Sequence, residues 1–151
     1  MSAIRPSRPS PNGQTTTPMS RPRRPAVLAD ADRWQLMRHL AWCDAVRPAP
    51  SPYLGHVLRR RLAASRPCGA EPPADAVTGG CRVTYSIGGG PAHTGLLAHG
   101  ARKAAAESGV IPVLSLLGAT LIGMRVGQSA PVLHEDGTIA RLTVLGVTRP
   151  A

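Results

Sequence analysis

The sequence is short of aromatic residues and of long apolar runs. Aromatic residues make up 3% of its 151 positions and phenylalanine is absent, so a large pocket lined by rings is not expected. No apolar stretch approaches the roughly 20 residues that a membrane-spanning helix requires. The first 25 residues carry arginine but no apolar segment, unlike a secretory signal. We therefore expect a cytoplasmic protein without membrane contacts.

Cysteine is also scarce, and its spacing argues against two kinds of site. The three cysteines are Cys43, Cys68 and Cys81. An odd number without a Cys-x-x-Cys pair indicates neither a disulfide framework nor a zinc site. Thiols that stay reduced are typical of an intracellular chain.

Residue patterns for catalysis and cofactor binding are missing as well. The five histidines are dispersed, and we expect none to share a helix face with a cysteine or a carboxylate. His93 and His99 would share one face of a strand, where we expect them to face solvent or to cap an element. Ser115 lacks the Gly-x-Ser-x-Gly surroundings of an activated serine. The glycines at 88–90 lack the Lys-Ser/Thr of a phosphate-binding loop. We expect no catalytic residue, no metal and no cofactor.

What the chain does have is positive charge. The net charge is +10, and Lys103 is the one lysine among 18 basic residues. Residues 1–26 contain five arginines and no acid, and residues 27–66 contain seven arginines against three aspartates. Such an excess favours contact with a polyanion or an acidic protein surface. An arginine-rich composition of the whole genome is the alternative explanation.

Composition divides the chain into four parts. Residues 1–26 are mostly Pro, Ser, Thr and Arg with little to bury, which predicts a disordered tail. Residues 27–66 are predicted to form a short helical hairpin, and residues 67–78 a linker. Residues 79–151 are predicted to form a small α+β domain of antiparallel strands with one short helix.

The hairpin is predicted from two helical patterns. The first helix begins with Asp30 as its N-cap and ends near Val46, before a Pro-rich stretch. The second begins at Ser51-Pro52, a cap followed by proline. The apolar residues at helical spacing are Trp34, Met37, Leu40 and Ala41 in the first helix, and Leu54, Val57, Leu58 and Leu62 in the second.

The C-terminal part shows the alternation typical of strands. A turn is predicted at 88–91, a hairpin turn at Asp136-Gly137, and a short helix capped by Ser115. The segment 101–109 is Ala-rich and bounded by glycine, so it is ambiguous between a helical turn and a loop. Strands are predicted at 81–87, 93–99, 129–133 and 138–148.

A series of short motifs follows in this half of the chain. In order they are Ile111-Pro112, Val113-Leu114, Ser115-Leu116-Leu117-Gly118, Leu121-Ile122-Gly123, Val126-Gly127-Gln128 and Asp136-Gly137. Their order and spacing resemble the C-terminal domain of the GreA/GreB transcript-cleavage factors over residues 79–149. The first half, with Asp30 and Asp32 at the start of its first helix, is similar to the regulator of nucleoside diphosphate kinase (Rnk) branch, where the long coiled coil is shortened to a hairpin.

The resemblance implies a fold and a partner. It implies that residues 79–151 adopt an FKBP-like fold that docks on RNA polymerase at the rim of its secondary channel. Prolyl isomerase activity is not implied, because Tyr85 is the one aromatic residue of this domain. Leu116 stands where the family has proline, which removes a rigid turn. The docking residues that the resemblance implies are Leu114, Ser115, Leu116 and Leu117.

The tip of the helical hairpin departs from the cleavage factors. In that family acidic side chains at the tip help to hold a catalytic metal, which requires negative charge near Mg²⁺. Here Asp44 is the one acid of the tip, and Arg47 stands three residues away. We therefore expect a non-catalytic transcription regulator, in which Arg59, Arg60 and Arg61 supply electrostatic attraction to the polymerase.

A basic nucleic-acid-binding module is the alternative function. It would bind DNA or RNA through the Arg-rich tail and through Arg59, Arg60 and Arg61, although interleaved aromatics and a readout helix are missing.

Deleting residues 1–26 separates these two functions. If the chain is a nucleic-acid-binding module, the deletion removes five arginines and DNA binding collapses. If the chain is a polymerase-binding regulator, polymerase binding persists after the deletion. DNA binding at several salt concentrations and polymerase pull-down with the truncated chain measure the two effects.

Overall fold

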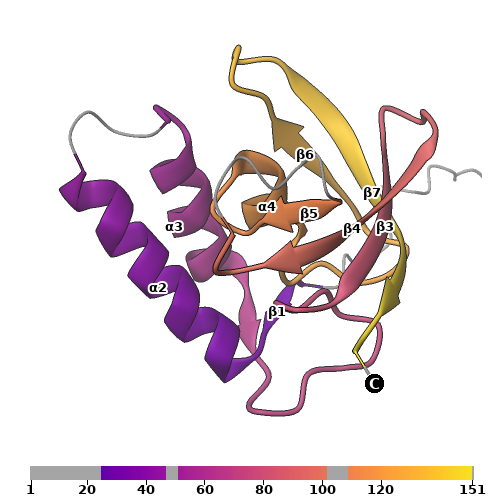
Figure 1. Cartoon of the computed structure of the whole chain (residues 1–151), viewed down its shortest axis with the longest axis horizontal. Helices are drawn as coiled ribbons and strands as arrows, with labels where there is room; N and C mark the ends of the chain where they lie inside the picture. Colours follow the sequence, from indigo (N-terminus) through magenta and orange to yellow (C-terminus); the bar gives the residue numbers. More distant parts are fainter. Residues whose placement is uncertain (1–24, 47–50, 102–108, 151) are drawn as a thin grey trace, which may run out of the picture.

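Two helices stand beside a curled β-sheet, with a third, short helix between them (Figure 1). The computed structural model describes residues 25–46, 51–101 and 109–150. Within these ranges, none of the helices is long and apolar enough to cross a membrane. The predicted α+β class is confirmed. The predicted disordered tail lies almost entirely outside the described residues.

The helical hairpin consists of α2 (Asp30–Ala45) and α3 (Leu54–Ala64). The helix α2 ends where predicted, because Val46 is extended and the Pro-rich stretch follows. Its N-cap is Ala29 instead of the predicted Asp30, which lies in the first turn, where a negative charge complements the helix dipole. The predicted start of the second helix at Ser51-Pro52 is wrong, because α3 begins at Leu54 and its N-cap is Tyr53.

The two helices differ in how well the predicted core face agrees with the structure. In α3 the prediction is confirmed, since Leu54 and Leu58 are buried and Val57 and Leu62 pack against the core. In α2 it holds for Leu40, which packs against the core, and is wrong for the rest, because Trp34 is 60% exposed, Met37 is 50% exposed and Ala41 is exposed. The buried residues of α2 are Asp32, Leu36, His39 and Cys43.

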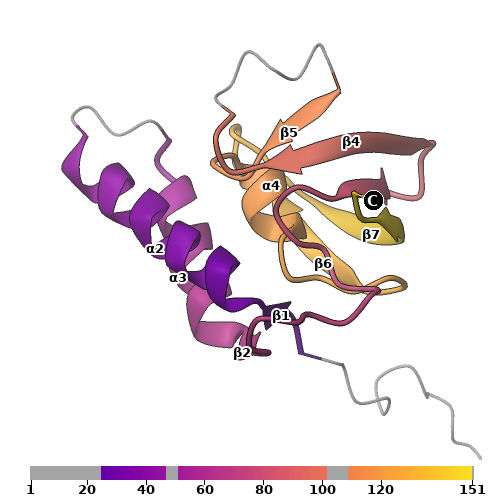
Figure 2. The same ribbon diagram turned by 60° about the horizontal axis from the view of Figure 1, so that its bottom comes forward.

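The hairpin is joined to the sheet by a well-packed segment. Strands β1 (Val27–Leu28) and β2 (Arg66–Pro67) pair in parallel at the base of the hairpin (Figure 2). The predicted linker, residues 67–78, follows β2. Within it Ala76 and Val77 are fully buried, and the Val77 amide donates to the Met124 carbonyl at 2.8 Å. Because this stretch contributes to the core, the helical hairpin is tightly connected to the sheet.

The main sheet has five strands in the order β5-β4-β3-β7-β6. The predicted strands and the turn at Asp136-Gly137 are found, with Gly137 at φ 89°. A left-handed residue of this kind favours glycine. The strands are β3 (Arg82–Ile87), β4 (Ala92–Ala98), β5 (Val110–Pro112), β6 (Ser129–Leu133) and β7 (Ile139–Thr148).

One strand departs from the expected antiparallel arrangement. Strand β5 pairs with β4 in parallel, while the other neighbours in the sheet are antiparallel. Parallel neighbours require a crossover connection instead of a tight turn, and residues 99–109 supply it. The ambiguous segment 101–109 falls within this connection, and its residues 102–108 lie outside the described ranges.

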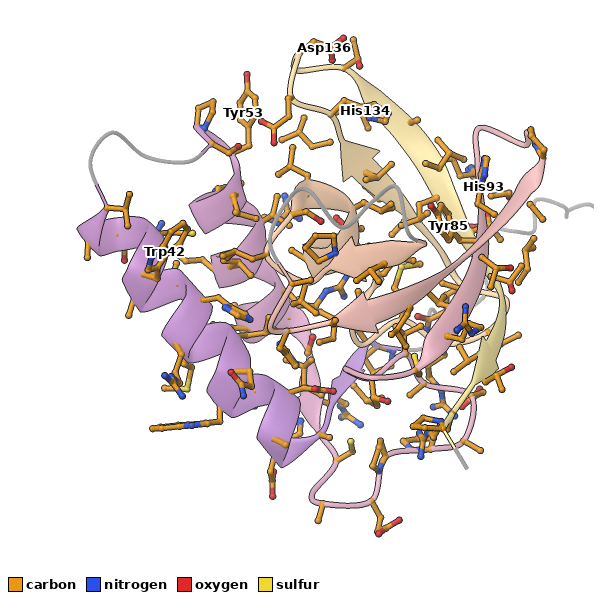
Figure 3. The ribbon with its side chains drawn as sticks, in the orientation of Figure 1. Trp42, Tyr53, Tyr85, His93, His134 and Asp136 are labelled. Carbon is orange, nitrogen blue, oxygen red and sulfur yellow. The ribbon has the colours of Figure 1, made fainter. Side chains whose placement is uncertain are left out.

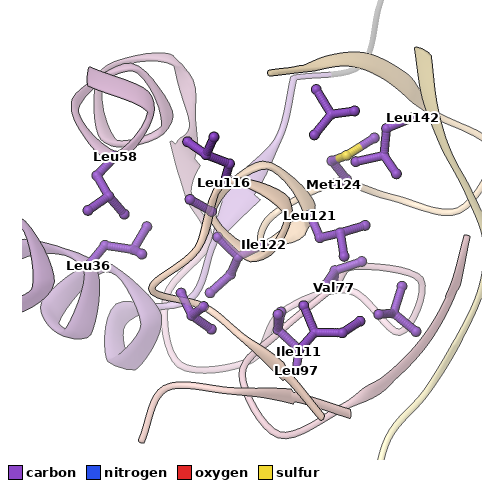
Figure 4. Close-up of a cluster of buried hydrophobic side chains, with 14 of the residues drawn as sticks. Leu36, Leu58, Val77, Leu97, Ile111, Leu116, Leu121, Ile122, Met124 and Leu142 are labelled. Carbon is purple, nitrogen blue, oxygen red and sulfur yellow. The ribbon is translucent and has the colours of Figure 1, made fainter. Parts of the chain in front are cut away.

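The core is continuous from the hairpin into the sheet. Leu36 of α2 and Leu58 of α3 face each other beside α4 (Leu116–Leu121), whose Leu121 points toward the sheet (Figure 4). Leu36, Leu58 and Leu121 are fully buried. Since each helix of the hairpin is too short to be stable alone, this shared core holds the hairpin in place.

Substitutions on the two faces of α2 distinguish the observed packing from the predicted one. We expect Leu36→Ala to lower the free energy of unfolding by about 2–5 kcal/mol, because it opens a cavity. Trp34→Ala and Met37→Ala are expected to cost less than about 1 kcal/mol each, as for other surface positions. Urea unfolding with a common m-value measures all three, and the reverse order would contradict the orientation of α2.

Candidate functional site

The sequence places the candidate docking residues at the start of α4, and the structure explains how that turn is built. Ser115 is the N-cap of α4, as predicted: its hydroxyl accepts from the Gly118 amide at 3.0 Å. The same hydroxyl donates to the Pro112 carbonyl at 2.6 Å. These two bonds tie the first turn of α4 to the end of β5.

Gly118 allows α4 to approach β5 closely. A Cβ atom at this position would overlap the Pro112 carbonyl oxygen and crowd the Val113 backbone. Only glycine therefore fits without a shift of the backbone. The geometry of this candidate docking turn, residues 112–118, thus depends on the contact between Gly118 and the Pro112 backbone, which any larger residue would break.

The four candidate docking residues are not equally accessible. Leu116 is 6% exposed and belongs to the core. Leu114 and Leu117 are partly buried, and each packs one side against the core while part of its surface stays accessible. Any apolar contact with a partner at this turn would therefore be made by Leu114 and Leu117, while Leu116 and Ser115 shape the turn.

The hairpin tip carries a neutralised carboxylate. Nη2 of Arg59 donates to both carboxylate oxygens of Asp44, at 2.7 and 2.9 Å. Both side chains are just over half exposed. An aspartate paired in this way presents little net negative charge to a metal ion. Arg47, the second candidate at the tip, lies outside the described residues.

The three adjacent arginines of α3 do not form one basic patch. Arg59 turns to Asp44, and Arg60 is exposed. Arg61 points inward, where its guanidinium donates to the carbonyls of Ala119 and Thr120 at the end of α4. Burial, with a smaller contribution from Arg60, lowers the pKa of Arg61 to about 10. Their placement gives no added support to a nucleic-acid interface.

A polar cluster that sequence reasoning missed joins α2 to the sheet. His99 Nε2 lies 2.8 Å from Oδ1 of Asp32, and His99 Nδ1 lies 3.1 Å from Nε2 of His39. Asp32 also accepts from the Gly79 amide, at 3.2 Å. Asp32 and His39 are buried, and the His99 side chain is 16% exposed. The expectation that His99 faces solvent or caps an element is therefore wrong, whereas His93 is exposed.

One signal for this cluster was present in the sequence. His39 and Cys43 are four residues apart on α2, and Asp32 precedes His39 by two helical turns, so all three share the buried face. The expectation that no histidine shares a helix face with a cysteine or carboxylate is wrong. No group of three or more His, Cys, Asp or Glu side chains in the described ranges is arranged to hold a metal ion. The contacts of the polar cluster join α2 to His99 and to Gly79.

The ring and carboxylate side chains at the sheet lie apart from this cluster. Tyr85 and His93 are in ring contact on neighbouring strands, with centroids 5.7 Å apart (Figure 3). Asp136 lies at the tip of the β6–β7 hairpin, where hydrogen bonds from Thr138 lower the pKa of its carboxyl group. Local contacts between strands explain the Tyr85–His93 pair, and local contacts in the turn explain the pKa of Asp136.

Double-mutant cycles test whether the polar cluster holds the hairpin on the sheet. For Asp32→Ala and His99→Ala we expect a coupling free energy of about 1–3 kcal/mol, because the pair is largely buried and removing either partner deprives the other of its shortest hydrogen bond. The exposed pair Asp44 and Arg59, changed in the same way, serves as the control and should give about 0.5 kcal/mol. Urea unfolding measures both cycles, and equal coupling in the two would contradict the structural role of the polar cluster.

The fold with these features is similar to that of one known transcription elongation factor. The prokaryotic transcription elongation factor GreA/GreB from Nitrosomonas europaea superposes with a TM-score of 0.58 at 17% identity, over 83% of this chain and 99% of that one. GreA factor homolog 1 of Thermus thermophilus gives a TM-score of 0.41 at 15% identity, over 82% and 99% of the two chains. The sequence matches no family profile and no curated protein. At this identity the first likeness establishes the fold.

Proposed function

We propose that this chain is a non-catalytic transcription regulator that binds RNA polymerase near its secondary channel, in the manner of the Rnk branch. The observation that carries the proposal is the fold it shares with a GreA/GreB elongation factor over 99% of that chain. The Ser115-capped turn supports it further, because the motif similarity to the family is concentrated in these residues. The contact residues in this proposal are Leu114 and Leu117, positioned by Ser115 and Leu116.

The proposal that the chain does not stimulate cleavage rests on the hairpin. Asp44 is the one acid of the tip, and its charge is compensated by Arg59. Helix α2 has 16 residues and α3 has 11, which at 1.5 Å per residue reach only about 24 and 16 Å. A short tip without a free negative charge is poorly suited to holding a catalytic metal deep in a partner enzyme. In this proposal the hairpin acts by occupying space near the secondary channel of the polymerase and by the positive charge of its arginines.

Substitution of the accessible leucines tests the proposed contact. We expect the double variant Leu114→Ser and Leu117→Ser to weaken binding to purified bacterial RNA polymerase at least tenfold, because two apolar contacts are lost. Leu145→Ser is the control, because Leu145 is 47% exposed and lies on β7, away from the turn. Fluorescence anisotropy of the labelled chain measures affinity, and urea unfolding verifies that each variant is folded.

A competition assay with the same proteins examines the function. The chain should displace a cleavage factor from the polymerase and lower transcript cleavage as its concentration rises, without stimulating cleavage when added alone. Undiminished affinity of the folded double leucine variant would refute the assigned contact. Cleavage stimulated by the chain itself would refute the non-catalytic role.

A further inference from the structure

A groove lies between α3 and the β6–β7 hairpin, and none of the four candidate docking residues lines it. Its volume is about 360 Å³, within the range of small-molecule sites. The residues that line it come from three elements that the core holds together. They are His56, Val57, Arg60, Arg61 and Ala64 of α3, Thr120 of α4, and Pro131, Leu133 and Ile139 of the β-hairpin.

One wall of this groove is basic and lacks a compensating acid. His56 and Arg60 are exposed and lie one helical turn apart on α3. Arg61 is largely desolvated beside them, and its hydrogen bonds go to backbone carbonyls. No carboxylate lines the groove among the described residues. Such an arrangement attracts an anion, because a desolvated positive charge is stabilised by a nearby negative one.

The opposite wall is apolar. Pro131, Leu133 and Ile139 present aliphatic surface, and Ile139 is 67% exposed. Val57 and Ala64 add aliphatic surface from α3. Covering this exposed isoleucine with an aliphatic group is favourable, because it removes apolar surface from water. The groove is therefore amphipathic across its width.

The edge of the sheet makes a peptide strand a poor occupant. Strand β6 is an edge strand. The His134 amide donates to the Thr138 carbonyl, and the Val144 amide donates to the Gln128 carbonyl. In a regular antiparallel ladder, the backbone N–H and C=O groups of the even-numbered residues of β6 therefore point toward β7. Pro131 then turns its nitrogen outward, where it carries no hydrogen, and interrupts any added strand. A small ligand is favoured over a β-strand.

We propose that this groove binds a small amphipathic anion, a carboxylate or phosphate attached to an aliphatic chain. The acid group lies at His56 and Arg60, and the chain covers Leu133 and Ile139. Arg61 contributes positive potential from below without leaving the α4 carbonyls. None of the groove residues belongs to the proposed contact at Leu114 and Leu117, so failure to bind the anion would leave that contact untouched.

Calorimetric titration of the full chain with matched ligands tests the site. The probes are decanoate and decyl phosphate, below their micelle-forming concentrations. Decanol, which keeps the alkyl chain without the acid group, and inorganic phosphate, which keeps the acid group without the chain, are the control ligands. We expect both amphipathic anions to bind at least tenfold more tightly than decanol or phosphate. The relative affinity of decanoate and decyl phosphate identifies the preferred acid group.

Matched variants locate the binding. Arg60→Gln and Ile139→Ser should each weaken decanoate binding at least tenfold. Arg38→Gln and Leu145→Ser, an exposed arginine and an exposed leucine outside the groove, should leave it within twofold. All four positions are exposed, so folding is expected to persist.

Three results would overturn the proposal. One is that neither amphipathic anion binds. Another is that the groove variants and the control variants lose decanoate affinity equally. The third is inorganic phosphate or a short RNA binding as tightly as decanoate with the same dependence on Arg60, which would identify a phosphate-contacting surface instead.

Discussion

The close packing of α4 against β5 is the constraint on which the rest of the structure depends. Gly118 lies against the Pro112 carbonyl with no space for a side chain, and Ser115 bonds both the helix and the strand. With α4 held there, Leu116 and Leu121 are buried in the core shared by the hairpin and the sheet. A helix of six residues has little stability of its own, so its tertiary contacts hold it in place.

The two ends of α4 serve different surfaces. Leu114, just before its N-cap, and Leu117 in its first turn are the residues proposed to contact the polymerase. Its last carbonyls accept hydrogen bonds from Arg61, which joins α3 to α4 and sets the basic wall of the groove. Because the carbonyl end of a helix carries partial negative charge, it stabilises the partly buried guanidinium of Arg61 without a carboxylate. One short helix thus orders an apolar surface at one end and a positively charged surface at the other.

The hairpin owes its position to partners on the sheet. Apolar residues lie on two faces of α2, so helical periodicity alone could not decide which face is buried. Asp32 and His39 decide it, because their polar atoms meet His99 and the Gly79 amide from distant parts of the chain. The other face, with Trp34, stays exposed. The sequence prediction placed Trp34 and Met37 in the core because they fall at helical spacing with Leu40 and Ala41.

By itself the sequence determined the features that depend on near neighbours. These are the end of α2 before the Pro-rich stretch, the core face of α3, the Ser115 cap, the turn at Asp136-Gly137 and the alternating strands. Each arises from backbone sterics or from side chains a few residues apart. Tertiary structure alone decided the buried face of α2, the parallel pairing of β5, the inward turn of Arg61 and the limited access to Leu116. These depend on residues beyond the reach of any local pattern, 14 positions away for the pairing of β5 with β4 and 58 for Arg61 with Ala119.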